Sequence, residues 1–363
     1  MNVALVHDSL VEFGGSERIF RIFLELFPKA DVYTAFADTR FLKKFFPGVS
    51  PRTSYLQSFP IGNHTSLVQA LSPVVWQQFD LSAYDLVISH SDHLGSVMVR
   101  VPHGVHISYI PSLPKNIFGI APPTPLQRII RYDQWIKPYY LAALPRTHIV
   151  TNSRHTQSVF KKFAGMASTV IYPPVTLPKQ PVNKFAGRYF LCVSRIAPGK
   201  HLDIAIQAAN MLHIPLRIAG VSNTPQYEKY LRHLAGPTVR FLGYQSDAVV
   251  AKLYQHAWAL VFPSENEDFG ITPLEANAHA VPVVAYYGGG AKETVIDKKT
   301  GLFFRLHTAE SLADAMTRIR SMRFSAATLR DHARSFSETR FKKAFMRYVR
   351  RAVRESEERT KVR

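Results

Sequence analysis

Cysteine and long apolar segments are both scarce in this sequence of 363 residues. The single cysteine, Cys192, excludes a disulfide within the chain, and its place in the apolar run 189–193 predicts a buried strand residue in a reducing compartment. No run approaches the roughly 18 apolar residues of a membrane-spanning helix. The first residues lack the basic segment and the long apolar stretch of a signal peptide, so we expect a cytoplasmic protein.

Acidic residues are few, with 26 Asp+Glu against 45 Lys+Arg and a formal net charge of +19. Residues 318–363 carry 15 Lys+Arg and 5 Asp+Glu, which is +10 of that total. A solvated terminal helix would explain such a segment. A basic face attracted to anionic lipid or to phosphate-bearing substrates would explain it as well. No nucleic-acid-binding module accompanies the charge, so we do not expect a nucleic-acid partner.

The length and a composition of 46% hydrophobic and 20% charged residues predict two globular domains. Short apolar runs alternate with helical patterns up to residue 172, and four prolines between 173 and 181 interrupt them before the alternation restarts. This pattern predicts two Rossmann-like, doubly wound α/β domains at 1–172 and 188–336, joined by a stiff linker at 173–187. Residues 337–363 are predicted to form a helix that crosses back to the first domain, followed by a basic tail.

The predicted elements follow from hydrophobic period, caps and breakers. Predicted strands are 3–6, 31–34, 86–89, 105–109, 148–151, 169–172, 189–194, 215–219, 239–242, 257–262, 282–285 and 301–304. Predicted helices are 16–26, 64–78, 125–143, 154–163, 201–212, 225–234, 247–256, 272–279, 309–320 and 337–355. Because ligands bind at the carboxyl ends of strands in such sheets, we expect the two domains to face each other across a cleft.

Residues 262–275 carry the strongest functional pattern, because they join an apolar strand to a helix that begins near Ile271. Two carboxylates flank the junction with seven residues between them: Glu267 in the loop and Glu275 in about the first helical turn. Gly270 lets a ligand approach the backbone N–H groups of the helix N-terminus, which attract anions. Carboxylates accept hydrogen bonds from hydroxyls, so the pattern suits a nucleotide-sugar, with hydroxyls at both ends and phosphates between.

Two cations, Arg195 and Lys200, lie five residues apart in the turn after the strand at 189–194. Both could converge on one diphosphate, the guanidinium as a fork and the ammonium as a point charge. The alternative is a pair of solvated surface cations. No paired-aspartate or other metal motif is present, so we expect no metal, and the cations and helix dipoles must neutralise a departing diphosphate.

Consecutive glycines mark two further turns. Gly14 and Gly15, between a strand and a helix, allow close approach of a phosphate or sugar, and a tight turn explains them equally well. The full G-x-G-x-x-G fingerprint is missing, which disfavours a nicotinamide enzyme. The glycines at 288–290 also permit a close ligand, while a plain helix-entry turn accounts for Glu293.

Taken in order, these motifs resemble the retaining glycosyltransferases of family 4, which have two Rossmann-like domains in the arrangement called GT-B and a two-glutamate signature. The resemblance spans nearly the whole chain and is strongest over residues 189–336. It is carried by Gly14-Gly15-Ser16-Glu17-Arg18, Thr151-Asn152-Ser153, Ile171-Tyr172-Pro173-Pro174-Val175, Ser194-Arg195 with Lys200, Arg240-Phe241-Leu242-Gly243-Tyr244, Glu267-Asp268-Phe269-Gly270-Ile271-Thr272-Pro273-Leu274-Glu275 and Gly288-Gly289-Gly290-Ala291-Lys292-Glu293.

The resemblance implies a role for each matching residue. Arg195 and Lys200 match the pair that neutralises the donor diphosphate, Glu267 the carboxylate that holds hydroxyls of the transferred sugar, and Glu275 the one that holds the ribose. With Arg195, Lys200 and Glu267 as catalytic residues, the remaining implied contacts divide between the two substrates. Donor-binding positions are Gly15, Gly243, Tyr244, Asp268, Phe269, Gly270, Ile271 and Glu275; acceptor-side positions are Gly14 and His93.

One departure concerns Pro111. In bacterial O-antigen and exopolysaccharide mannosyltransferases, which this chain most resembles, a histidine that touches the transferred sugar stands there. Proline has no side-chain donor, so either sugar recognition differs at this point or a neighbouring histidine substitutes; the candidates are His90, His93, His103 and His106. His93 is favoured because it follows the strand at 86–89.

Two stretches, 40–47 and 128–140, mix cations with large apolar residues. Such a face suits the interfacial layer of a membrane, while helix packing with Arg and Lys pointing outward is the alternative. The resemblance favours the membrane, because a lipid-diphosphate-linked glycan is a frequent acceptor in the family. We therefore expect an anionic membrane surface as a partner and a peripheral location at the inner face of the cytoplasmic membrane.

Together, the residues and the resemblance predict a metal-independent, retaining glycosyltransferase without a cofactor. It would move a hexose, first of all mannose from GDP-mannose, onto a lipid-linked or polysaccharide acceptor in bacterial surface glycan synthesis. A UDP-sugar donor in the same fold is one alternative. A non-catalytic nucleotide- or glycan-binding relative is another, against which the presence of Arg195, Lys200, Glu267 and Glu275 argues.

Overall fold

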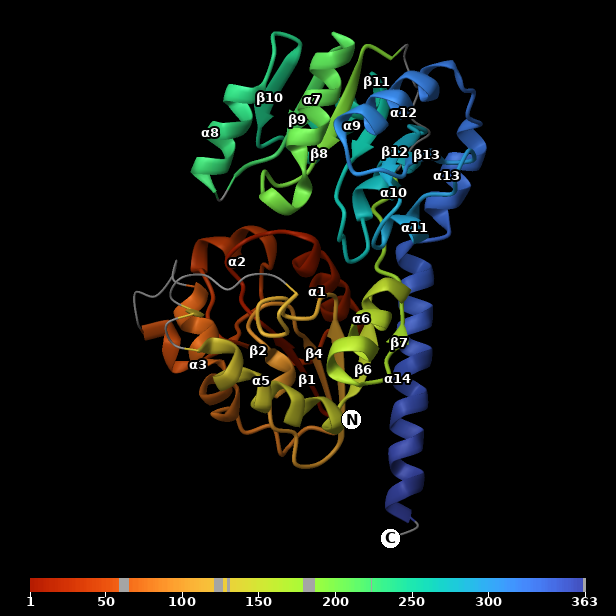
Figure 1. Ribbon diagram of the computed structural model, residues 1–363. Coiled ribbons are helices and arrows are strands. Elements are labelled where there is room, and N and C mark those ends of the chain that lie inside the picture. Colours follow the sequence, from red (N-terminus) through yellow and green to blue (C-terminus); the bar gives the residue numbers. More distant parts are fainter. Residues whose placement is uncertain (59–64, 121–126, 129–130, 179–186, 223, 362–363) are drawn as a thin grey trace. The chain divides into compact units, whose positions relative to one another are not determined.

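The computed structural model in Figure 1 describes the chain apart from residues 59–64, 121–126, 129–130, 179–186, 223 and 362–363. It contains two compact units: unit 1 comprises Met1–Tyr172 and Phe341–Arg363, and unit 2 comprises Pro173–Arg340. Most of the predicted linker, residues 179–186, lies outside the described part. The beginning of the predicted linker is attached to unit 2, because the Val175 N–H donates to Phe336 O at 2.9 Å.

Unit 1 is built on a seven-stranded parallel sheet in the order β3-β2-β1-β4-β5-β6-β7. Its central strands are buried on both faces, which is why they read as near-continuous apolar runs rather than as alternating ones. The strands are β1 Val3–His7, β2 Asp31–Thr34, β3 Arg52–Thr53, β4 Leu86–His90, β5 Val105–Ile110, β6 His148–Thr151 and β7 Thr169–Val170.

Helices cover both faces of this sheet, and each face has its own apolar cluster. Trp76 and Tyr140 are fully buried in one cluster. In the other, Phe23 of α1 packs on Phe345 of the last helix, with ring centroids 4.6 Å apart. The helices are α1 Gly15–Leu26, α2 Thr39–Phe45, α3 Thr65–Gln77, α5 Tyr132–Ala143, α6 Arg154–Ala164 and α14 Glu338–Lys361, with short 3₁₀ turns η1 Tyr55–Ser58, η2 Ser96–Met98 and η3 Leu144–Arg146. From Phe341 on, α14 belongs to unit 1.

Unit 2 is built on a six-stranded parallel sheet in the order β10-β9-β8-β11-β12-β13, again with an apolar cluster on each face. Its strands are β8 Tyr189–Val193, β9 Leu216–Ala219, β10 Val239–Gly243, β11 Ala257–Phe262, β12 Val283–Tyr286 and β13 Gly301–Phe304. Its helices are η4 Pro198–Lys200, α7 Leu202–Leu212, α8 Pro225–Leu234, α9 Asp247–Gln255, α10 Ile271–Ala278, α11 Ala291–Thr294, α12 Ala309–Ser321 and α13 Ala326–Arg334.

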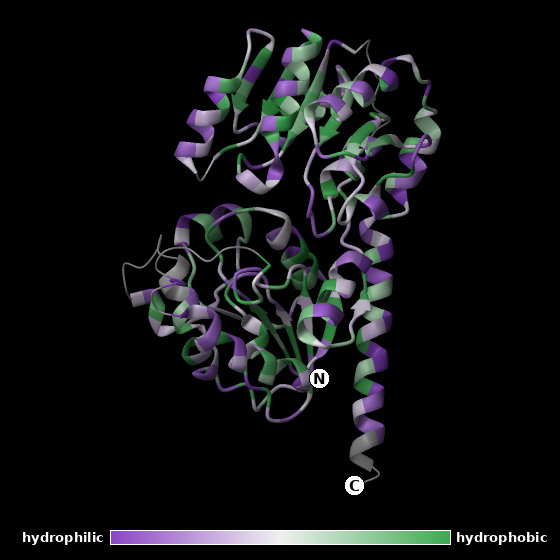
Figure 2. Ribbon diagram, in the orientation of Figure 1, coloured by the Kyte–Doolittle hydropathy of each residue, from purple (hydrophilic) through white to green (hydrophobic). Residues whose placement is uncertain are grey.

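Figure 2 shows hydrophobic residues (green) concentrated on the strands of both units and hydrophilic residues (purple) spread over the outer helices. The prediction of two doubly wound α/β domains is therefore confirmed. Within the described part of the chain, every helix is too short or too polar to cross a bilayer.

The predicted helix at 125–143 is wrong as a single element. Arg131 has a left-handed backbone (φ 48°), so the regular helix begins at Tyr132; residues 121–126 and 129–130 lie outside the described part. Two helices escaped prediction, α2 and α13. Both are short and polar on most positions, with Phe41 buried in one and Leu329 in the other, which leaves little hydrophobic period to detect.

Candidate active site

The strand order of unit 2 places two of the predicted loops side by side. From β8 the sheet extends through β9 to β10 on one side, while β11, β12 and β13 continue on the other. The boundary between β8 and β11 is therefore a topological switch point, where open α/β sheets bind ligands at the carboxyl ends of their strands. Arg195 and Lys200 follow β8, and Glu267 follows β11.

The structure brings Lys200 and Glu267 into direct contact. Lys200 Nζ lies 2.5 Å from Glu267 Oε2, and the two side chains are 21% and 22% exposed. A charge-assisted hydrogen bond in this partly buried position fixes both groups. Arg195 is exposed in the same turn, and its guanidinium has no hydrogen-bond or ion-pair partner among the described residues. The site thus presents one fixed ammonium, one fixed carboxylate and one accessible guanidinium.

The junction between β11 and α10 depends on Gly270. This residue is the N-cap of α10 with φ 85°, a left-handed conformation that favours glycine. α10 begins at Ile271, so its first N–H groups follow directly after the glycine. Glu275 is the fifth residue of the helix and lies in the second turn, not the first, where its side chain is half-buried.

The glycines at 288–290 have a structural role that their sequence did not reveal. The Gly290 N–H donates to Glu267 O at 2.7 Å. A Cβ on Gly289 would lie 2.5 Å from Glu267 O, and one on Gly288 would lie 2.7 Å from Glu265 O. The space beside these glycines is therefore filled by the loop that carries Glu267. These glycines pack against that loop and support it, and they do not leave room for a ligand.

Gly243 and Tyr244, predicted to bind the donor, lie at the end of β10, which is an edge strand of the sheet. Gly243 has φ 67°, and its carbonyl accepts from the Gly220 N–H at 2.9 Å. The Tyr244 side chain is 76% exposed. Gly220, which sequence analysis did not single out, packs so closely on Ser194 O that no side chain fits, and it thereby sets the path of the turn before Arg195.

Three residues from separate loops of unit 2 form a cluster that sequence analysis missed. His201, Glu265 and His307 are half-buried, and one potential ligand atom from each lies within 4.8 Å of the others. His307 Nε2 lies 2.8 Å from Pro263 O, so that nitrogen is the N–H donor and Nδ1 remains the acceptor. Burial first, and then the charge of His307, lowers the pKa of His201. The three could hold a metal ion, but their distance in sequence matches no metal motif.

The predicted sites in unit 1 look different. Gly14 is the N-cap of α1, and its N–H donates to Glu17 Oε2 at 2.8 Å, so this donor is already occupied. Burial acts to raise the pKa of Glu17, but the hydrogen bond and charge of His7, with backbone amides, hold it below its usual value. A Cβ on Gly15 would meet open space, so a ligand can reach this position.

Of the four histidines proposed to replace the one missing at Pro111, three are poorly placed. His90 and His106 are buried, and burial lowers the pKa of each to about 3. His103 precedes β5, whereas Pro111 follows it, so the two lie at opposite ends of that strand. His93 follows β4 at the carboxyl edge, is 66% exposed and lies 3.4 Å from Asp92.

The stretch at 40–47 is not an apolar membrane face. Phe41 and Phe46 are buried, and Phe45 stacks on Phe13 with ring centroids 4.6 Å apart. Its cations point outward, as in ordinary helix packing.

The second stretch is divided. In α5, Tyr132, Ile136 and Tyr140 are buried, while Trp135 and Tyr139 are 48% and 40% exposed. Trp135 Nε1 donates to Ala70 O at 3.0 Å, which holds the indole against α3.

Comparison with known proteins finds similarity over most of unit 2. Residues 177–336 match the profile of the family described as Glycosyl transferases group 1. The chain is 25% identical over 206 residues to the alpha-1,3/1,6-mannosyltransferase ALG2 of Eremothecium gossypii, covering 42% of this chain and 40% of that protein. It is 39% identical over 143 residues to a D-inositol 3-phosphate glycosyltransferase of Actinosynnema mirum, covering 35% and 34%. The matches thus span roughly a third to two-fifths of these relatives.

Solved structures show the same fold over nearly the whole chain. Anabaena Alr3699/HepE in complex with UDP has a TM-score of 0.68 at 18% identity, covering 96% of this chain and 99% of that one. The lipopolysaccharide outer core galactosyltransferase WaaB, in its apo form, has a TM-score of 0.67 at 15% identity, covering 96% and 99%. Residues 177–336 of unit 2 are therefore similar to group 1 glycosyltransferases, and the chain has the GT-B fold of its glycosyltransferase neighbours.

Proposed function

We propose that this protein is a retaining glycosyltransferase that transfers a hexose from a nucleoside diphosphate sugar without a metal ion. The observation that carries the proposal is the 2.5 Å contact between Lys200 and Glu267 at the switch point of unit 2. This contact supports the proposal because an ammonium can neutralise a leaving diphosphate, while the adjacent carboxylate can accept hydrogen bonds from the hydroxyls of the departing sugar. The pair follows β8 and β11 at their carboxyl ends, where open α/β sheets bind ligands.

The ion pair prepares the site for a donor. An ammonium has three donors and a carboxylate accepts several hydrogen bonds, so the pair can persist while Lys200 also binds a phosphate oxygen and Glu267 a sugar hydroxyl. Arg195 adds a second positive charge from the same turn. Glu275 binds the ribose, the first N–H groups of α10 bind phosphate, and Tyr244 with Gly243 contacts the base.

Retention follows from attack on the same face that the diphosphate leaves. The bond between the anomeric carbon and the phosphate oxygen breaks while the acceptor oxygen bonds to that carbon. The acceptor proton passes to the diphosphate, whose negative charge Arg195 and Lys200 stabilise. No protein nucleophile is needed.

For the donor we propose GDP-mannose. The similarity to a protein named as a mannosyltransferase supports mannose. The UDP complexes of the Anabaena neighbour favour the alternative of a UDP-sugar. A panel of GDP, UDP, ADP and their sugars in a thermal-shift assay decides between them, because a ligand at 100 times its Kd stabilises by about 2.7 kcal/mol. Equal shifts for all three nucleotides, or none, would contradict a specific donor site.

For the acceptor we propose a lipid-linked saccharide at the inner face of the cytoplasmic membrane, in bacterial surface glycan synthesis. The fold shared with a lipopolysaccharide galactosyltransferase and the net charge of +19 support this location. Transfer onto an extracted lipid-linked fraction, measured against the same glycan released from its lipid, tests the preference.

A further inference from the structure

The part of α14 that belongs to unit 1 has two opposite faces. Its buried residues are Phe341, Phe345, Tyr348, Val349 and Ala352, all in the apolar cluster that covers one face of the unit 1 sheet. Packing therefore uses one side of the helix completely. The other side is left to solvent.

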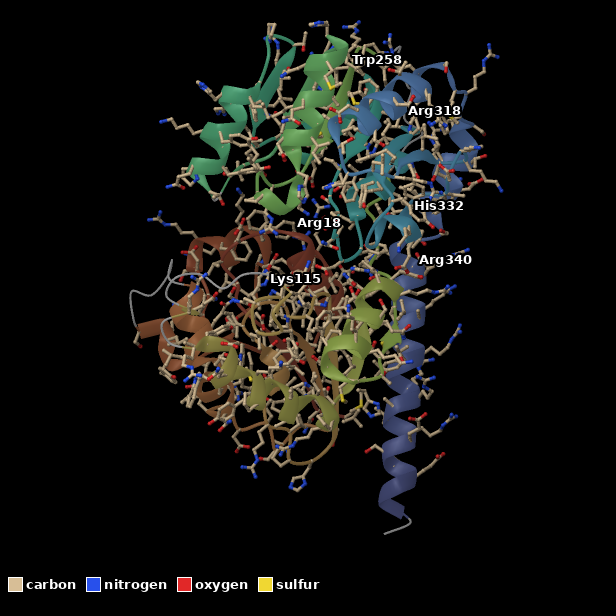
Figure 3. All side chains as sticks on the ribbon, in the orientation of Figure 1. Arg18, Lys115, Trp258, Arg318, His332 and Arg340 are labelled. Atoms are coloured by element: carbon tan, nitrogen blue, oxygen red, sulfur yellow. The ribbon has the colours of Figure 1, made fainter. Side chains whose placement is uncertain are left out.

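Four exposed cations occupy that other side: Lys343, Arg347, Arg350 and Arg354. At about 100° per residue they fall within an arc of about 60°, centred roughly 170° from the buried residues. We call them the cationic stripe. It extends about 16 Å along the helix axis, since its first and last members are eleven positions apart. Figure 3 shows nitrogen-tipped side chains along α14 that point away from the rest of unit 1.

Little in the structure neutralises this stripe. The side chains of Lys343, Arg347 and Arg350 have no ion-pair or hydrogen-bond partner among the described residues. Arg354 lies 3.9 Å from Glu358, and both of these side chains are largely exposed, so this pair contributes little. The acidic residues of α14 near the stripe, Glu355 to Glu358, begin only after its last member.

The stripe borders a groove of about 670 Å³ that is lined by further cations and by two apolar residues, Leu26 of α1 and Met346. The other lining residues outside the stripe are Lys342, which pairs with Glu25 at 2.6 Å, and Arg351. Cations around an apolar floor match the interface of an anionic bilayer, where phosphates meet acyl chains. A nucleic-acid groove would offer aromatic rings for stacking, whereas the aromatic rings of α14 are buried.

We propose that the cationic stripe docks the enzyme onto an anionic bilayer, with lipid phosphates bound along it. The proposal rests on the proposed function, which places a lipid-linked acceptor at a membrane. Of the three segments that the sequence offered for membrane contact, 40–47, 128–140 and 318–363, it selects the last and narrows it to four exposed cations on α14.

The test is flotation of the full-length protein with vesicles of phosphatidylglycerol and phosphatidylcholine, against phosphatidylcholine alone, at 0.1 and 1 M salt. The variant carries Lys343→Gln, Arg347→Gln, Arg350→Gln and Arg354→Gln. Its matched control removes four other exposed cations of unit 1 through Lys43→Gln, Lys44→Gln, Lys161→Gln and Lys162→Gln. Each cation near an anionic surface strengthens binding about fivefold, so the stripe variant should partition several hundredfold more weakly.

The expected result is salt-sensitive flotation of the wild type and the control, and its loss in the stripe variant with an unchanged melting temperature. Loss in the control alone, equal loss in both variants, or a wild type that does not float would overturn the proposal. Release of nucleoside diphosphate from the donor, with a soluble acceptor analogue, is measured in parallel. If no nucleoside diphosphate is released but flotation still depends on the stripe, the proposed function is contradicted while the docking surface is supported.

Discussion

Gly290→Ala perturbs the loop that carries Glu267 without changing any side chain assigned to chemistry. Gly290 has an ordinary right-handed backbone (φ −70°, ψ −13°), so the added methyl group is the whole perturbation. Its Cβ would lie against Phe269 Cα, 2.6 Å from Phe269 O and 2.7 Å from Asp268 O. Ordinary contacts begin at 3.4 Å, so the two oxygens must retreat by about 0.7–0.8 Å.

This displacement should weaken both stability and turnover. Forcing a methyl group into a packed site lowers the free energy of unfolding by about 1–3 kcal/mol. A misplacement of about 1 Å near the chemistry lowers the rate about 100-fold, so kcat/KM for the donor should fall by that order. Release of nucleoside diphosphate measures the rate, and thermal unfolding measures the stability.

Gly199→Ala is the matched control for this experiment. Gly199 precedes Lys200 in the neighbouring loop, and a Cβ there meets no atom within 4 Å. We expect its melting temperature to equal that of the wild type. Wild-type kcat/KM together with a wild-type melting temperature in Gly290→Ala would refute the support of the Glu267 loop by the glycines.

Three further predictions follow from the site and the fold. Glu275→Ala should lower donor turnover by orders of magnitude with an intact fold, because a buried ribose hydroxyl loses its acceptor; an unchanged Kd for the nucleoside diphosphate would contradict that role. His90 and His106 have folded pKa values of about 3, below the unfolded value of about 6.5, so the unfolded chain binds more protons in between. The free energy of unfolding is then highest above pH 6.5 and falls as the pH drops towards 3, by about 1.4 kcal/mol per pH unit for each histidine. In His90→Phe, thermal unfolding should show the pH dependence of His106 alone. Treatment with EDTA should leave turnover unchanged; its loss, with recovery on adding Mg²⁺ or Mn²⁺, would show that a metal ion neutralises the leaving group.

Strands were the easiest elements to predict. The predicted ranges 31–34, 148–151, 257–262 and 301–304 match β2, β6, β11 and β13 residue for residue. Buried parallel strands must be apolar on both faces, so the sequence itself marks where each begins and ends. The start of α6 was also predictable, since its N-cap Ser153 accepts from the Thr156 N–H and the helix begins at Arg154 as predicted.

Contacts between loops were beyond sequence reasoning, because they depend on strand order. The cluster of His201, Glu265 and His307 draws on three loops separated by dozens of residues, and no local spacing encodes it. For the same reason the glycines at 288–290 looked like a ligand-binding turn, whereas their missing side chains make room for the backbone of Glu265 and Glu267.

The sequence also did not show which side chains point into the core and which point to solvent. The stretch at 40–47 has the composition of a membrane face, yet its aromatic rings fill the core of unit 1. In α14 the apolar face is also buried by packing, but its cations form an exposed face on the opposite side of the helix. Composition alone could not separate these two cases; the burial of Phe41 and Phe345 does.

The most direct test of the central claim is donor turnover by wild type and Lys200→Ala. Each is incubated with GDP-mannose and, separately, with UDP-glucose, and release of GDP or UDP is measured in the presence of a glycan acceptor. We predict acceptor-dependent release by the wild type with one of the two donors, and a rate at least 100-fold lower for Lys200→Ala at an unchanged melting temperature. Equal rates for the two proteins would contradict the assignment of the Lys200 and Glu267 pair as the catalytic centre.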